Sequence, residues 1–338
     1  MTKPTRYFLI GSVVVVAAGL ATGLVAYYNG GLTFRSSSEP AEFSYLPAGS
    51  AAVAYADVRA VMDSNFRQRL RQVLPTGDEQ ERLRAEIGVD IERDIDTVVA
   101  SFVADGGPAG GGAVVLVRGR FNEATIEAKA VEHGGVVESY KGKRIITMGG
   151  PADAVASASG GCVAFLESGL LALGDVASVK RAIDTRTSGD DVTKSADLMK
   201  IVNELQGSGN AWVVGRLDGL TKAEDLPAPV RDQLGAVQLF AARLHIDGGV
   251  SGLLRAEARD DQAAEQLRDV VRGVLAAGRL VSGADTRVEA VLNSFQLQGT
   301  GRTVTLSFSV PAEVFDIVNG LAALGGLAEQ PRKTPGGK

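Results

Sequence analysis

The alternation of apolar and polar positions is most regular in the C-terminal third of the chain. Val237 to Ile246 and Val250 to Ala258 each place apolar residues at every second position, with Asp247-Gly248-Gly249 between them. This period of two predicts two half-buried antiparallel strands. A three-residue loop pairs Ile246 with Val250 and puts both apolar sets on one face, whereas a two-residue loop would mix the faces. We therefore predict the three-residue loop.

A helical period follows this hairpin. The apolar residues between Asp261 and Leu280 fall on one stripe, as expected for a helix that packs on a sheet. A second predicted hairpin turns at Gly299-Thr300-Gly301, and its second strand, Val304 to Val310, alternates apolar and hydroxyl residues. Pro311 then suits the first turn of another helix. Each hairpin is expected to present one apolar face to helices and one polar face to water.

The N-terminal half repeats this order of elements less cleanly. Strand, helical excursion, two strands, helix, hairpin and helix occur in both halves, and the first half contains one additional hairpin. The first-half hairpins are predicted to turn at Lys141-Gly142 and Ser168-Gly169, and Asp175 is predicted to cap a helix that runs to Asp184. We interpret this order as an ancient duplication; a chance recurrence of common α+β units is the alternative.

One long apolar segment stands apart from these patterns. Residues 7–28 carry no charge, and 22 residues at about 1.5 Å each suffice to cross about 30 Å of hydrocarbon. Tyrosines flank the segment and Lys3 and Arg6 precede it, so the positive-inside rule places the N-terminus in the cytoplasm. We predict a single-pass signal anchor. A cleaved signal peptide is the alternative, although its apolar region is usually shorter.

These features predict an α+β fold. It consists of an N-terminal transmembrane helix followed by a duplicated unit of antiparallel hairpins, with helices packed on one sheet face. The predicted division is a cytoplasmic N-terminus, a membrane span, a flexible linker, two α+β halves and a disordered tail, at residues 1–6, 7–28, 29–42, 43–190, 191–324 and 325–338.

Composition excludes several classes of function. The formal net charge of -5 argues against a nucleic-acid-binding surface, which needs clustered Lys and Arg. Cys162 is the single cysteine and His133 and His245 are the only histidines, so one chain cannot assemble a thiolate cluster or a site of several imidazoles. We expect no cofactor, no metal and no nucleic-acid partner.

Short motifs do not supply a catalytic site either. Residues 106–112 have the composition of a phosphate-binding loop, but a strand follows them where such a loop requires a helix. The acidic residues Asp90, Asp94 and Asp96 lack the glycine turn and closing Glu of a calcium loop. His133 is predicted to end a helix, where a cationic side chain complements the helix dipole. We therefore name no catalytic residue.

The polar face of the C-terminal hairpins is the candidate binding surface. A flat sheet face that helices leave uncovered can bind an envelope protein, a glycan or a lipid, and an ordinary hydrated sheet face is the alternative. The residues predicted to form it are Arg243, His245, Arg255, Glu257, Thr303 and Thr305.

Three segments carry a resemblance to a group of proteins. A single N-terminal span, the sequence Leu46-Pro47-Ala48 before the strand AVAYADV, and the hairpin FQLQGTGRTVTLSFSVP resemble uncharacterised exported bacterial proteins that carry a domain of unknown function. The resemblance implies a localisation and a fold, and it supplies no catalytic residues. We expect a membrane-anchored protein on the periplasmic side of the inner membrane, acting as a non-enzymatic binding or scaffolding module. A hydrolase or transferase with an unrecognised active site is the alternative.

Overall fold

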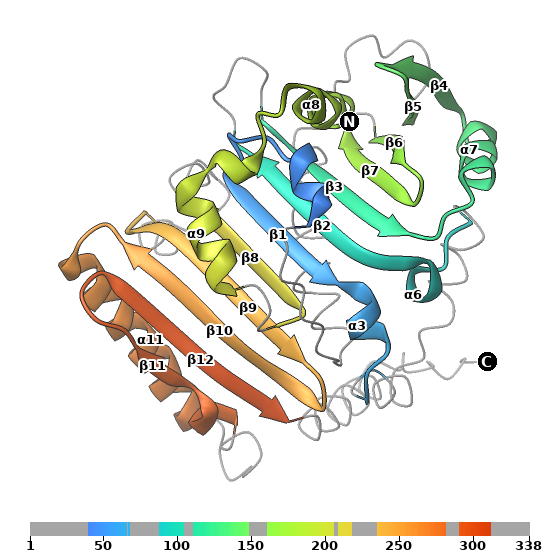
Figure 1. Ribbon diagram of the computed structural model, residues 1–338. Coiled ribbons are helices and arrows are strands. Elements are labelled where there is room, and N and C mark those ends of the chain that lie inside the picture. Colours follow the sequence, from blue (N-terminus) through green and yellow to red (C-terminus); the bar gives the residue numbers. More distant parts are fainter. Residues whose placement is uncertain are drawn as a thin grey trace, which may run out of the picture.

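The computed structural model describes residues 40–65, 67, 88–104, 111–148, 161–205, 209–217, 235–281 and 291–311 (Figure 1). The helical elements are η1 Ala41–Tyr45, α3 Val58–Met62, α6 Ile91–Asp94, α7 Glu123–Glu132, α8 Val176–Ser188, η2 Val192–Lys194, α9 Ala196–Leu205 and α11 Asp261–Val281. The strands are β1 Ala52–Asp57, β2 Ile95–Val103, β3 Gly112–Gly119, β4 Gly135–Tyr140, β5 Lys143–Met148, β6 Gly161–Glu167, β7 Leu170–Asp175, β8 Ala211–Arg216, β9 Val237–Ile246, β10 Gly249–Ala258, β11 Gln296–Gln298 and β12 Thr303–Pro311.

These strands form one 12-stranded antiparallel sheet in the order β11-β12-β10-β9-β8-β1-β2-β3-β7-β6-β5-β4. β1 and β8 lie next to each other near its middle, and their pairing places Tyr55 opposite Trp212. β1 comes from the predicted first half and β8 from the predicted second half. The two predicted halves therefore share a continuous set of hydrogen-bonded strands.

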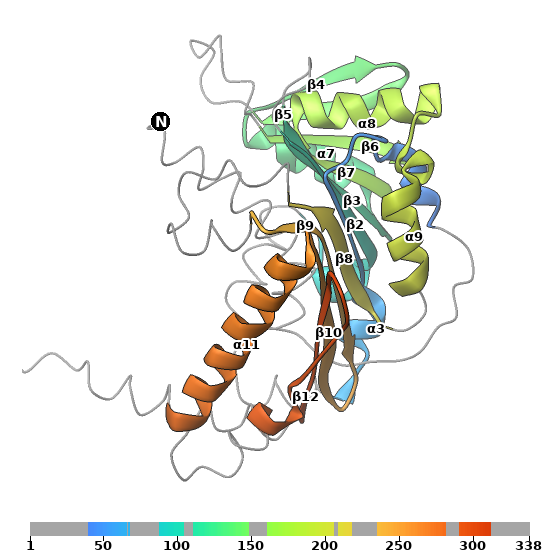
Figure 2. The same cartoon turned by 90° about the vertical axis from the view of Figure 1, so that its left-hand side faces the viewer.

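Helices cover both faces of this sheet. Figure 2 shows α8 and α9 on one side and α11 on the other. The largest apolar cluster lies on the α8 and α9 side and includes Leu116 and Val202, which are almost completely buried. On the opposite side, Ala264 of α11 belongs to a smaller cluster with Ala258 and Val304. Each layer of helices thus has its own apolar contact surface.

The predicted architecture is wrong in this respect. It placed helices on one face of a duplicated unit of hairpins, whereas the structure has a single large sheet with helices on both faces. The central strands are buried on both sides: Val98, Val99 and Ala100 are all buried. The alternation of polar and apolar residues shows only that one face of a strand is more buried than the other. A strand that is apolar on both faces has no such alternation, so its sequence does not indicate where a helix packs.

The predicted membrane helix also requires correction. Residues 7–28 lie outside the described residues, and no helix in the described ranges is long and apolar enough to cross a membrane. α11 has the length of a membrane span, with 21 residues, but it carries Glu265, Arg268 and Arg272 in its middle. We therefore withdraw the transmembrane helix and the single-pass inner-membrane localisation. The membrane as a partner through residues 7–28 stays a prediction.

Several local predictions are confirmed. Ile246 pairs with Val250, as the three-residue loop requires. The β4–β5 hairpin turns at Lys141 and Gly142, which have φ angles of 48° and 76°, as in a two-residue turn with left-handed residues. Asp175 caps α8 by accepting a hydrogen bond from the Ser178 amide at 2.9 Å. The loop, the turn and the helix cap could therefore be predicted from the sequence.

The thiol of Cys162 should be unreactive in the folded protein. Cys162 is 2% exposed in the cluster beneath α8, and burial raises the pKa of its thiol to about 11. The thiolate is the form that attacks thiol reagents, so a buried neutral thiol reacts slowly. We expect no labelling by a chromogenic disulfide reagent in the native protein and complete labelling in denaturant. Rapid labelling of the native protein would show that the α8 layer opens readily.

Asp57 joins β1 to α3 and lies in a partly buried position. Its Oδ1 accepts a hydrogen bond from the Ala60 amide at 2.8 Å and so caps the helix. Burial raises the pKa of this carboxyl, the bond from Ala60 opposes the increase, and the charges of Asp96 and Asp63 add to it. The ionised carboxylate is therefore less favourable in the folded state than in the unfolded chain.

Replacing Asp57 with asparagine should change how stability depends on pH. A raised folded-state pKa gives a stabilising contribution that is present below the unfolded value of about 3.9 and is lost as the pH rises through the folded value. Asparagine keeps a capping oxygen but does not titrate. We expect the stability of Asp57→Asn relative to the native sequence to increase as the pH rises above about 3.9 and through the raised folded-state pKa of Asp57, measured by urea unfolding at several pH values. A difference that stays constant with pH would contradict this assignment.

Candidate functional site

The six residues predicted as a binding surface lie on neighbouring strands. The register places Arg255 opposite Thr305 and Glu257 opposite Thr303, where β10 pairs with β12. Residues that face each other across strands point their side chains to the same side of a sheet. The alternation along each strand then gives all six residues one face, which we call the open polar face and define as Arg243, His245, Arg255, Glu257, Thr303 and Thr305.

This face continues the side of the sheet that α9 covers. Arg243 pairs with Trp212, whose ring belongs to the apolar cluster beneath α8 and α9. Figure 1 shows α9 in front of β8, whereas β9, β10 and β12 have no described helix in front of them and α11 lies behind. The six side chains are half-buried by their neighbours on the sheet. The open polar face is thus a flat surface bordered by one helix.

Arg255 lies near the middle of the open polar face and is held by two carboxylates. Its Nη1 donates to Glu204 of α9 at 2.6 Å and its Nη2 donates to Glu257 at 2.6 Å. The side chain of Arg255 is 27% exposed. Partly exposed pairs of this kind contribute little to stability, but they fix the direction of the guanidinium. They also compensate its charge, so the face is not a strongly cationic patch.

β12 contributes hydroxyl groups along its length. Alternate positions of β12 carry hydroxyl side chains, and they pair with β10 residues on the same side of the sheet as the open polar face. These positions are Thr303, Thr305, Ser307 and Ser309. A hydroxyl both donates and accepts hydrogen bonds and carries no charge. The surface is therefore suited to a polar partner of low charge.

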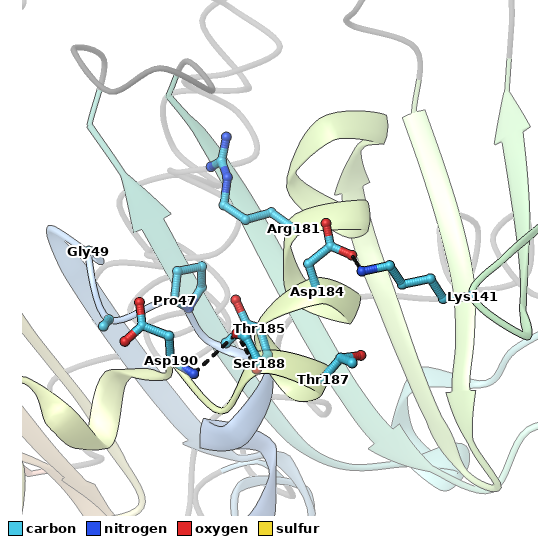
Figure 3. A pocket seen from close by; sticks show the side chains of 10 residues that line it. Pro47, Gly49, Lys141, Arg181, Asp184, Thr185, Thr187, Ser188 and Asp190 are labelled. Atoms are coloured by element: carbon cyan, nitrogen blue, oxygen red, sulfur yellow. Dashed lines mark hydrogen bonds and ion pairs between the residues drawn. The ribbon is translucent and has the colours of Figure 1, made fainter.

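A separate hollow lies where α8 ends, close to the loop that leads into β1 and to the β4–β5 turn (Figure 3). Its volume is about 470 Å³, within the range of small-molecule sites. Its lining combines hydroxyl, acidic and basic side chains: Pro47, Ala48, Gly49, Lys141, Arg181, Asp184, Thr185, Thr187, Ser188 and Asp190.

Two charged groups in the hollow, Lys141 and Asp184, pair with each other. Figure 3 shows Lys141 reaching Asp184, and their Nζ and Oδ1 atoms are 2.6 Å apart. The Tyr140 hydroxyl also donates to Asp184 at 3.0 Å, and this bond raises the pKa of Tyr140. The Ser188 hydroxyl donates to the Thr185 carbonyl at 3.2 Å, which satisfies the end of α8. These contacts connect the end of α8 to the β4–β5 turn and satisfy polar groups at the end of the helix.

The acidic cluster singled out in the sequence has structural roles. Asp90 caps α6 by accepting from the Glu92 amide at 3.1 Å, and Asp94 accepts from the Asp90 amide at 2.8 Å. Asp96 pairs with Arg59 at 2.6 Å. Over the described ranges, no group of three or more His, Cys, Asp or Glu residues is arranged to hold a metal ion.

The two histidines lie far apart in the strand order. His133 caps the C-terminus of α7, where its Nδ1 lies 2.7 Å from the Lys129 carbonyl oxygen, and it precedes β4 at one edge of the sheet. His245 lies on β9, eight positions from β4 in the strand order and toward the opposite edge. The structure therefore brings His245, but not His133, to the open polar face.

Sequence reasoning missed a polar network beneath η1. Glu42 is 5% exposed and forms an ion pair with Arg118 of β3. The Tyr45 hydroxyl donates to Glu167 at 2.8 Å; burial and this bond raise the pKa of Tyr45 to about 12. Glu42 and Arg118 are separated by 76 positions, and no local pattern connects them. Only the strand order reveals this network.

Comparison with known proteins gives little further information. No protein-family model matches the chain and no curated protein matches it. A solved structure described as crystal form I of TP0453 covers 85% of this chain and 99% of its own, with 10% sequence identity and a TM-score of 0.46. A likeness at this level carries no argument about function.

Proposed function

We propose that this protein is a non-enzymatic binding module and that the open polar face recognises the surface of a partner protein. The observation that supports this proposal is that described helices cover one part of this side of the sheet and leave another part uncovered. Beneath α8 and α9 this side consists of buried apolar residues such as Leu116 and Ala172. On β9, β10 and β12 it carries hydroxyl and charged side chains, and no described helix covers them.

The dimensions of the open polar face indicate the strength of the interaction. β9 and β10 have 10 residues each and β12 has 9. At about 3.3 Å per residue and about 4.8 Å between strands, the surface measures roughly 33 Å by roughly 14 Å. Interfaces of this size lie well below the standard of about 800 Å² per partner and belong to weak or transient complexes. We therefore expect reversible binding.

The charges of the open polar face restrict the partner further. Arg255 is compensated by Glu204 and Glu257, and the hydroxyls of β12 carry no charge. The contribution of long-range steering is then small, and recognition depends on hydrogen bonds at short distance. We expect the affinity to depend only weakly on salt.

Carboxylates placed at the centre of the open polar face should abolish binding. Thr305→Glu puts a new carboxylate opposite Arg255, and Ser307→Glu adds a second charge on the same strand and face. The matched control is Gln262→Glu with Gln266→Glu, because both glutamines are exposed on α11 across the sheet. Partners captured from the source cells by chemical crosslinking would be compared by quantitative mass spectrometry.

The expected result is a partner recovered with the native chain and the α11 control but lost with the β12 variant. Thermal unfolding must show that the β12 variant is folded. Equal recovery with both variants would contradict the proposal, because the open polar face would then not contact the partner.

A further inference from the structure

The edge strand β4 is unusually exposed for the end of a large sheet. β4 pairs with β5 on one side only, and it is the terminal strand of the order. Its four central residues, Val136 to Ser139, are all exposed. Among the described residues, no other strand pairs with the second side of β4.

The hairpin geometry shows which main-chain groups face outward. Tyr140 and Lys143 close the two-residue turn, and in such a hairpin the closing pair exchanges hydrogen bonds. Bonded pairs then alternate along an antiparallel ladder, so Glu138 and Val136 bond to β5. The N–H and C=O groups of Val137 and Ser139 consequently point to the open side, and over the described ranges no further hydrogen bond of theirs is found.

The opposite edge of the sheet is protected. β11 has only 3 residues, so it offers a short edge. Where β12 extends past β11, the Ser309 amide donates to the Ser294 hydroxyl at 3.1 Å. β4 is longer, with 6 residues, and it contains no proline. The two edges therefore differ in their readiness to pair with another strand.

Apolar side chains accompany the open edge. Val131 of α7, Val136 and Val137 are 48%, 58% and 39% exposed, and α7 contacts β4. Exposed apolar groups that adjoin unpaired main-chain groups are the combination that favours strand addition by another chain.

We propose that two copies of this chain pair through β4, antiparallel and centred on Val137, to extend the sheet across a twofold axis. In this register the outward groups of Val137 meet those of the other copy's Val137, and Ser139 meets Gly135. Glu138 lies opposite Val136, so no like charges face each other. Centring on Glu138 instead would place two glutamates opposite each other, which destabilises a strand pair.

The register can be tested by crosslinking. Bonded cross-strand residues have Cα atoms about 5.5 Å apart, within the range for a disulfide. Val137→Cys should therefore crosslink two copies on mild oxidation. Ser139→Cys is the matched control on the same edge and face, because the two copies of residue 139 would lie about 14 Å apart along the strands. Cys162 is buried and does not compete.

Self-association itself can be tested without oxidation. Val137→Pro removes an outward N–H but no bond to β5, so an edge strand tolerates it. Sedimentation equilibrium of the full chain should show a monomer–dimer equilibrium, weakened at least about tenfold in Val137→Pro. Thermal unfolding serves as the folding control.

Three results would overturn the proposal. One is that the chain stays monomeric at every concentration, even if its β4 edge accepts a strand from another protein. The second is undiminished self-association of a folded Val137→Pro variant. The third is crosslinking of Ser139→Cys as fast as that of Val137→Cys.

Discussion

Replacing Trp212 with alanine should lower the free energy of unfolding by about 3 to 5 kcal/mol. Trp212 is 4% exposed on β8. Its ring stacks on Tyr55 of β1 with centroids 5.7 Å apart and meets the edge of Phe43 at 6.1 Å. The substitution leaves a cavity where β1 and β8 join and under the helical layer, and such cavities close only partly.

Circular dichroism in a urea titration is the suitable measurement, since the variant has no tryptophan to report by fluorescence. Trp212→Phe keeps an aromatic ring in contact with Tyr55 and should lose much less stability. A loss below about 1 kcal/mol for Trp212→Ala would mean that the β1–β8 junction is loosely packed, contrary to the structure.

Replacing Arg118 with alanine should lower the free energy of unfolding by about 2 to 4 kcal/mol. Arg118 is the ion-pair partner of Glu42, whose side chain is 7% exposed, and its Nη2 also lies 3.9 Å from Glu167. Removing the cation leaves a buried carboxylate without compensation, which is more costly than the pair itself is favourable. The estimate is below that for a fully buried pair because Arg118 is 34% exposed.

A second substitution separates this mechanism from a loss of packing. Glu42→Gln in the Arg118→Ala background removes the uncompensated charge, so the double variant should be more stable than Arg118→Ala alone. Urea unfolding of the native chain, both single variants and the double variant gives the coupling between the two positions. Additive losses would show that the two side chains do not interact in the folded protein.

The parts of the fold that depend on local chemistry could be predicted from the sequence. The Lys141-Gly142 turn, the pairing of Ile246 with Val250, the Asp175 cap and the amphipathic helix α11 all rest on residues close to one another in the chain. The arrangement of strands could not be predicted in the same way. The pairing of Tyr55 with Trp212 joins distant segments, and both strands contain buried residues on both faces.

The candidate site likewise has features that the sequence predicts and features that it does not. The residues of the open polar face were predictable, because polar and apolar positions alternate in β9, β10 and β12. The ion pair from Arg255 to Glu204 of α9 was not, since it connects positions separated by 51 residues across a helix and a strand. The outward main-chain groups of Val137 required the edge position of β4, which only the strand order shows.

We propose that the open polar face is the surface that contacts a partner protein. The most direct test places a photoreactive amino acid at Ser307 on β12 and, in a second chain, at Asp269, which is exposed on α11 across the sheet. After irradiation in the source cells, we expect a discrete crosslinked product from position 307 and none from position 269. A product from position 269 alone, or the same product from both positions, would contradict it.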